Sequence, residues 1–151
     1  MAHDISMLNG LVETSKDGEK GFATAAKDAK NPDLKAMFSK RAEDCARGAA
    51  ELQEIIASHG GKPEEGGSVA GALHRGWVNL RAAVSTRDDL AILEECERGE
   101  DVAKAAYRKA LDDDSLSPDE RSVVQRQYEG VVRNHDQIRD LRNSYRAAKG
   151  S

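Results

Sequence analysis

A length of 151 residues fits a single domain that can bury a core. The chain is 38% hydrophobic and 33% charged, and its 4% aromatic content with three prolines favours helix over sheet. Its 23 basic and 27 acidic residues are interspersed and give a net charge of -4, which argues against nucleic acid and against a membrane surface as partners.

Features of the N-terminus and the cysteines favour a cytoplasmic protein. The opening Met-Ala-His-Asp lacks the basic and apolar stretches of a signal peptide, and no apolar run approaches the roughly 20 residues that span a bilayer. Cys45 and Cys96 lie far apart, outside any C-x-x-C motif and among small or apolar neighbours. This setting predicts two reduced, buried thiols.

Capping signals predict a first pair of helices. Asp4 can cap a helix that runs to about Lys30, where Asn31-Pro32-Asp33 ends it and starts the next. The second helix is expected to run to about His59 and to end at Gly60-Gly61, a C-cap signal.

The chain between this pair and the next is long enough to carry a short helix. A polar loop covers Gly61 to Gly67, and Ser68 opens a helical stretch to about Val84. Its apolar stripe comprises Val69 or Ala70, Leu73, Trp77, Leu80 and Val84. We expect this stripe to pack against the rest of the protein. The alternative is a surface for a partner or for a second copy.

A second pair of helices follows. Thr86, with acidic residues in the next turn, is expected to begin a helix that fades in the run Asp112-Asp113-Asp114. Ser117-Pro118-Asp119-Glu120 combines an N-cap serine, a proline at N1 and a glutamate at N3, which is a capping box. The fourth helix is expected to run to about Ala147.

Each long helix carries an apolar stripe with a period of about 3.5 residues. The stripes are Ile5, Leu8, Val12, Ser15, Glu19, Phe22, Ala26 and Ala29; Phe38, Ala42, Cys45, Ala49, Leu52 and Ile56; Leu90, Leu93, Cys96 or Glu97, Glu100, Ala103 and Tyr107; and Val124, Tyr128, Val131, His135, Ile138 and Tyr145. Short links make each pair antiparallel, and the long link crosses the length of the bundle. The sequence therefore predicts one all-α domain over residues 1–151, a ferritin-like four-helix bundle whose long crossover between helices two and three contains a short extra helix.

The two halves of the chain also align weakly with each other. Gly18-Glu19 falls on Gly99-Glu100 in one helix pair, and Phe38 falls on Val124 in the other. Both alignments are consistent with two helical hairpins related by an approximate twofold axis.

Two carboxylates, Glu19 and Glu100, occupy stripe positions where an apolar residue is expected. A buried carboxylate needs a cation, a metal or a hydrogen-bonded neighbour. An internal pair such as Glu19 with Arg41 is one solution, and His135 also lies on a stripe. Glu94 and Glu97 flank the third stripe and are expected to be solvated. Mid-helix glycines, including Gly18 and Gly99, indicate close approach of neighbouring backbones.

Four stretches, LVETSKDGEKGF, AGALHRGWVNL, ILEECERGED and VQRQYEGVVRNHDQIRDLR, resemble an uncharacterised bacterial family of the ferritin-like superfamily that carries a domain-of-unknown-function label. The resemblance runs from about Ile5 to Ala147, and GALHRGW and ECERGED are its most specific parts. It implies the bundle fold and no established activity.

The di-metal branch of that superfamily uses single glutamates on two helices and Glu-x-x-His on the other two. By resemblance, Glu19 and Glu100 match the single glutamates, and Glu43 and Glu129 match those of the paired motifs. The expected histidines are absent, because Ala46 and Val132 stand at those positions. An intact di-iron centre is therefore not expected.

A metal bound through Glu19, Glu100 and His135, such as iron, manganese or zinc, remains an alternative to a metal-free polar network. The leading hypothesis is a non-enzymatic bundle, stress-linked by analogy, that self-associates as a dimer or binds a protein partner, with no cofactor. Its first rival is a metal-binding bundle with oxidase or metal-handling activity. Its second rival is a ligand carrier with a pocket between the helices.

Overall fold

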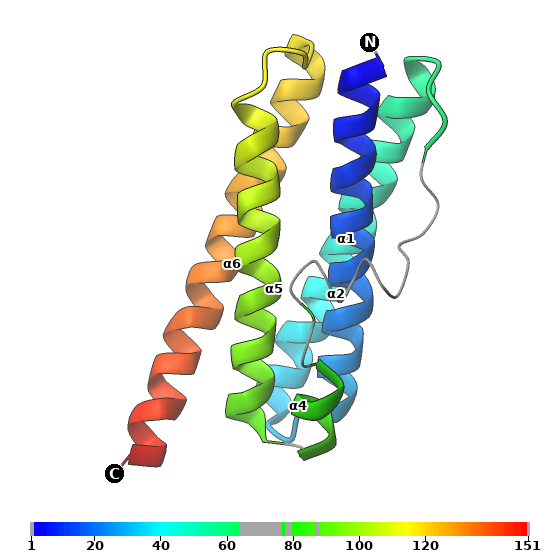
Figure 1. The fold of residues 1–151 in the computed structure, drawn as a ribbon. Coiled ribbons are helices and arrows are strands. Elements are labelled where there is room, and N and C mark those ends of the chain that lie inside the picture. Colours follow the sequence, from blue (N-terminus) through cyan, green and yellow to red (C-terminus); the bar gives the residue numbers. More distant parts are fainter. Residues whose placement is uncertain (1, 64–76, 78–79, 87, 151) are drawn as a thin grey trace.

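The computed structural model describes residues 2–63, 77, 80–86 and 88–150, and these residues form helices and short connections without a strand (Figure 1). The helices are α1 (Ala2–Asp28), α2 (Pro32–Ser58), α4 (Leu80–Thr86), α5 (Asp89–Leu111) and α6 (Pro118–Gly150). The prediction of an all-helical protein is confirmed. Within the described part of the chain, no helix is both long and apolar enough to cross a bilayer.

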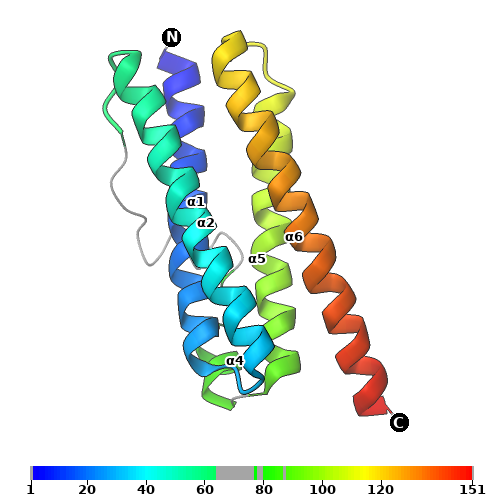
Figure 2. The same cartoon turned by 180° about the vertical axis from the view of Figure 1, so that it is seen from behind.

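The four long helices form two antiparallel hairpins, α1 with α2 and α5 with α6 (Figure 1). The C-terminal end of α2 lies at one end of the molecule and α4 at the opposite end (Figure 1). The short helix expected from Ser68 begins only at Leu80 within the described residues, and Trp77 precedes it outside the helix. The view from behind shows α2 and α6 on the same face, with the C-terminal half of α6 leaning away from α2 (Figure 2). The hairpins pack on each other mainly through α1 and α5.

Side chains cap α2 and α6 at the predicted positions, whereas Asp4, the predicted cap of the first helix, lies within the first turn of α1. Asn31 accepts a hydrogen bond of 2.8 Å from the Asp33 N–H at the start of α2. At the start of α6, the Glu120 N–H donates to Ser117 Oγ over 3.2 Å, and the Ser117 N–H donates to Glu120 Oε1 over 2.7 Å, which is the predicted capping box. These local signals therefore act as expected.

The structure corrects the predicted start of α5. The N-cap is Asp88, whose carboxylate accepts a hydrogen bond of 3.0 Å from the Leu90 N–H, whereas Thr86 is the last residue of α4. Asp88 takes this position because its carboxylate reaches the first free N–H groups of α5, where the helix dipole also favours a negative charge.

The predicted stripes of the long helices supply most of the core, which forms two clusters along the bundle. The cluster nearer α4 contains Phe22, Phe38, Trp77, Ile92, Leu93 and Ile138 among others. The other cluster includes Leu8, Leu52, Ile56, Tyr107 and Val124. Both predicted thiols, Cys45 and Cys96, are free and buried.

Trp77, from the crossover, lies inside the first cluster and is 5% exposed. Its ring meets that of Phe22 edge-on, with centroids 5.2 Å apart and an interplanar angle of 81°. Leu80 and Val84 of the same predicted stripe also pack against this cluster. The prediction that the stripe packs on the bundle is confirmed for these residues, and Leu73 lies outside the described residues.

Because its ring is largely covered within one chain, Trp77 does not form a dimer surface on the outside of the bundle. The mid-helix glycines also differ from expectation. A Cβ added at Gly21 or Gly99 would lie within 3 Å of Trp77 ring atoms, and one added at Gly18 would lie 2.9 Å from Cys45 Sγ. These three glycines therefore make room for side chains and not for neighbouring backbones.

Candidate functional site, a groove between the two hairpins

A groove of about 1280 Å³ lies between α2 and α6, and residues of α1 and α5 form its floor. It exists because the hairpins contact each other through α1 and α5, while α2 and α6 pack on each other only sparsely. Small residues line much of it, namely Gly18, Ala36, Gly48, Ala50, Gly99, Ala103 and Gly130. The single tryptophan, Trp77, also reaches the groove.

A buried ion pair between Arg41 of α2 and Glu100 of α5 lies at the floor of the groove. Arg41 Nη2 is 3.3 Å from each carboxylate oxygen, and the side chains of Arg41 and Glu100 are 11% and 3% exposed. The guanidinium also stacks over Phe22, 5.8 Å from the ring centroid. The sequence predicted a cation for a buried glutamate, and the structure pairs Arg41 with Glu100 in place of Glu19.

Burial controls the titration of the groups around this pair. It raises the pKa of Glu100, and the attraction of Arg41 only partly offsets that effect. Burial also raises the pKa of the Cys45 thiol to about 12. The groove therefore presents Cys45 as a thiol and not as the thiolate that a nucleophile requires.

A second polar chain crosses the groove through Tyr107. The Tyr107 hydroxyl donates to Gln127 Oε1 over 2.7 Å and lies 3.3 Å from Ser15 Oγ. Gln127 Nε2 donates to the Gly48 carbonyl over 3.2 Å and to Glu51 Oε1 over 2.8 Å. One chain of hydrogen bonds thus links all four long helices, and burial raises the pKa of Tyr107 to about 12.

The other predicted glutamates do not join Glu100. The side chain of Glu19 is 38% exposed and lies 3.8 Å from Lys16 Nζ, one turn earlier on the same helix. Glu43 and Glu129 are exposed, as their positions off the apolar stripes implied. The predicted metal ligands Glu19, Glu43, Glu100, Glu129 and His135 therefore do not converge, because three of the five point to solvent.

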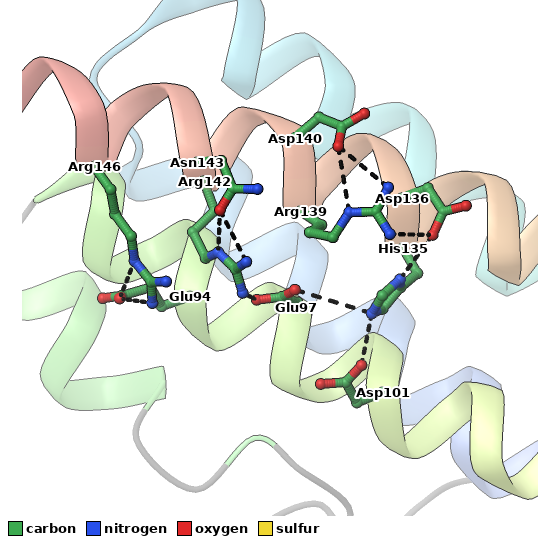
Figure 3. Close-up of polar contacts among 10 residues, drawn as sticks. All are labelled: Glu94, Glu97, Asp101, His135, Asp136, Arg139, Asp140, Arg142, Asn143 and Arg146. Atoms are coloured by element: carbon green, nitrogen blue, oxygen red, sulfur yellow. Dashed lines mark hydrogen bonds and ion pairs between the residues drawn. The ribbon is translucent and has the colours of Figure 1, made fainter.

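His135 belongs instead to a network of charges between α5 and α6 (Figure 3). Its Nε2 lies 2.6 Å from Asp101 Oδ1 and 3.9 Å from Glu97 Oε2, and its Nδ1 lies 3.1 Å from Asp136 Oδ1. His135 is close enough to lower the pKa of Glu100, but its ring is held by these carboxylates. Its predicted role as a metal ligand beside Glu19 and Glu100 has no geometric support.

The same network continues toward the end of α6. Arg142 pairs with Glu97, and Arg146 Nη2 lies 2.6 Å from Glu94 Oε2 (Figure 3). Glu97 is buried, so the expectation that it is solvated is wrong. Arg142 makes this burial tolerable, and a sequence pattern within one helix does not reveal a partner on another helix.

Comparison with known proteins places the chain in a family without assigning it an activity. No curated protein matches the sequence. The family model described as "Domain of unknown function (DUF2383)" matches residues 3–113, from α1 to the end of α5. The match includes Arg41, Trp77 and Glu100, whereas α6 and His135 lie beyond it. Because the match covers well over half of the chain, this protein belongs to the family of the domain of unknown function DUF2383.

Proposed function

We propose that this chain is a non-enzymatic, ferritin-like four-helix bundle that associates with a second copy of itself, by seating a helix of that copy in the groove between α2 and α6. The order of hairpin, lengthwise crossover and hairpin supports the ferritin-like assignment (Figure 1). A bacterial and stress-linked setting is inferred from the resemblance of the sequence to that family and superfamily, and the two free, buried cysteines favour a cytoplasmic location.

The observation that carries this proposal is the pair of glycines on opposite walls of the groove. Gly48 lies within α2 and Gly130 within α6. A Cβ added at either would make only ordinary contacts, 3.6 Å from Gln127 Nε2 and 3.7 Å from Arg133 Nη2. The chain's own packing therefore does not require glycine at these two positions.

Glycine within a helix is nevertheless unfavourable, by about 1 kcal/mol relative to alanine. A second helix that approaches the α6 wall closely would explain Gly130, since small side chains let helix backbones come together. At Gly48 the partner would meet the Gln127 amide, which already contacts that wall. Gly18, Gly21 and Gly99 differ, because a Cβ at each would collide with Cys45 or Trp77 of the same chain.

The charges along the groove favour a partner with mixed charge, such as this chain. On the α2 side Arg47 pairs with Asp44, and across the groove Arg126 of α6 pairs with Glu51. Both signs thus alternate along the rim. A surface of this kind suits the interspersed charges of a second copy better than a strongly acidic or basic ligand.

The chemistry of the groove favours binding over catalysis. Arg41 and Glu100 neutralise each other, Tyr107 is engaged in hydrogen bonds, and the pKa of Cys45 is raised to about 12. An activated nucleophile or general base would need a pKa shifted toward neutrality. The rival metal-handling function at mid-bundle is disfavoured, because Glu19, Glu43 and Glu129 face solvent.

Light scattering across the micromolar concentration range tests the proposal. We expect the wild-type mass to rise toward twice 16.4 kDa. Gly130→Leu should remain folded by circular dichroism and return the mass to that of the single chain, because leucine fills the groove. A wild-type mass that stays at 16.4 kDa at all concentrations contradicts the proposal.

Gly10→Leu is the matched control. Gly10 lies in α1 and is exposed, and among the described residues no atom outside the adjoining helix backbone lies within 4 Å of an added Cβ. The substitution adds the same side chain to a helix but outside the groove, so the dimer should persist. Equal loss of association in both variants would place the interface elsewhere and reject the groove.

A further inference from the structure

Three residues with metal-binding side chains meet at the end of the molecule opposite α4. Asp4 lies in the first turn of α1, His59 is the C-cap of α2, and Glu120 is in the first turn of α6. These three helix ends lie together at one end of the bundle (Figure 1). One ligand atom from each residue lies within 4.8 Å of the other two.

The cluster is largely withdrawn from water. Glu120 is fully buried, Asp4 is 7% exposed, and the side chain of His59 is 36% exposed. His59 Nδ1 lies 2.9 Å from Glu120 Oε2. The two carboxylates are thus inside, and the imidazole forms the side of the cluster that faces solvent.

Local structure holds two of the three side chains in place. The Ser117 N–H donates to Glu120 Oε1 over 2.7 Å, which directs the other oxygen, Oε2, toward His59. The backbone of His59 is held by the turn that ends α2, where the Gly61 N–H donates to the Ile56 carbonyl over 2.9 Å and Gly60 has a φ of 79°. Metal ligands in proteins are oriented by partners of this kind.

The chemistry of the cluster suits a cation. Two carboxylates and one imidazole share a largely buried site, where a bound cation would offset the repulsion between the carboxylates. The carboxylate of Glu120 meets Ser117, His59 and Asp4. An imidazole nitrogen such as that of His59 can supply a lone pair to a metal ion.

We propose that Asp4, His59 and Glu120 bind one divalent transition-metal ion, with zinc as the best match. Imidazole nitrogen and carboxylate oxygen are both zinc ligands, with bonds of about 2.0–2.2 Å. Ligand atoms around such an ion lie about 3–4 Å apart, which the spacing here allows after small side-chain shifts. The exposed side of His59 provides the route of entry and leaves a coordination position for water.

Bound metal would join both hairpins at this end, because α1 and α2 belong to one and α6 to the other. The role is therefore structural, and it is independent of the groove and of self-association. A metal-free cluster is the competing explanation, since carboxylates in the first turn of a helix are stabilised by the helix dipole and by the capping box.

Calorimetric titration of chelator-treated protein with Zn²⁺ distinguishes a metal site from a metal-free cluster. We expect one equivalent of Zn²⁺ per chain and a higher midpoint of thermal unfolding with the metal, since a ligand that binds the folded state stabilises it. His59→Ala should weaken binding at least tenfold while the far-ultraviolet circular dichroism stays unchanged, because His59 is on the surface. Asp4→Asn should weaken it similarly.

His135→Gln is the control for binding at any histidine, because His135 lies among carboxylates between α5 and α6, away from the cluster. This variant should bind zinc like the wild type. Co²⁺ in place of zinc should give a visible absorption spectrum that is lost in His59→Ala. Absence of zinc binding, or binding that survives both His59→Ala and Asp4→Asn, would overturn the proposal.

Discussion

The indole ring of Trp77 fills the space beside Gly99, where an added Cβ would lie 2.4 Å from two of its ring carbons. Gly21 on α1 faces the same ring, with three ring carbons at 2.7 Å from an added Cβ. Trp77 thus sits between α1 and α5, the two helices through which the hairpins pack. A residue of the crossover is therefore part of the joint between the hairpins.

Gly99→Ala should destabilise the protein although alanine is the better helix former. The added methyl group would collide with the rigid ring of Trp77, and overpacking of this kind costs about 1–3 kcal/mol. The free energy of unfolding in urea measures the effect. Gly10→Ala is the control and should stabilise the protein by up to about 1 kcal/mol, because in the described part of the chain its Cβ would collide with no packed side chain. A gain in stability for Gly99→Ala would show that Trp77 does not occupy this space.

Breaking the buried pair of Arg41 and Glu100 from one side should be costly. Arg41→Met leaves the carboxylate of Glu100 buried without its cation, and loss of one partner of a buried pair costs about 3–5 kcal/mol. Replacing both residues, Arg41→Met with Glu100→Leu, should recover most of that loss, because no charge is then left buried. Denaturation of both variants and of the wild type measures their free energies of unfolding. A double variant as unstable as Arg41→Met would contradict the explanation.

Glu100 should make stability depend on pH on the acid side of neutrality. Its pKa in the folded protein is raised above the ordinary value of 4.5, chiefly by burial. The folded state therefore holds this proton more tightly than the unfolded state. The resulting stabilisation is complete below about pH 4.5, and it is lost as the pH rises through the pKa of Glu100 in the folded protein. Glu100→Gln cannot titrate, so wild-type stability should fall relative to this variant across that window. A constant difference would show that the pKa is not raised.

Asp88 should contribute stability in the opposite sense. A hydrogen bond from Lys149 and its role as N-cap of α5 lower its pKa below 3.8. Its contribution is present above that value and is lost as the pH falls through the folded pKa. Asp88→Ala should cost about 1 kcal/mol at neutral pH, whereas Asp88→Asn keeps the cap and should cost less. Thermal unfolding of both variants measures the difference. If both variants lose the same stability, the contribution of Asp88 comes from its charge and not from its hydrogen bond as N-cap.

Both cysteines should resist thiol reagents while the protein is folded. Burial raises the pKa of Cys45 to about 12 and that of Cys96 well above its ordinary value. Labelling by iodoacetamide at mildly alkaline pH should be slow in buffer and rapid for both thiols in denaturant. Fast labelling of Cys45 in buffer would show that the groove opens to its thiol.

The helices themselves were predictable because their signals are local. The capping box of Ser117 and Glu120, the turn at Asn31 and the glycines after His59 act within a few residues of each helix end. The apolar period likewise requires only the geometry of a single helix. The start of α5 was misplaced at Thr86 because Asp88, two residues on, is the stronger cap.

Packing between helices determines which side chains are buried and which of them meet. Glu19 and Glu100 occupy matching positions in the two halves, yet Glu19 reaches solvent and Glu100 meets Arg41 inside. The sequence pattern allows Trp77 to pack inside the bundle or to lie on its surface. The space that α1 and α5 leave for its ring decides that it packs inside. Asp4, His59 and Glu120 each read as an ordinary helix-end residue, and their meeting depends on where three helices end in space. A buried charge or a ligand set is defined by neighbours distant in the chain, and local patterns carry no information about them.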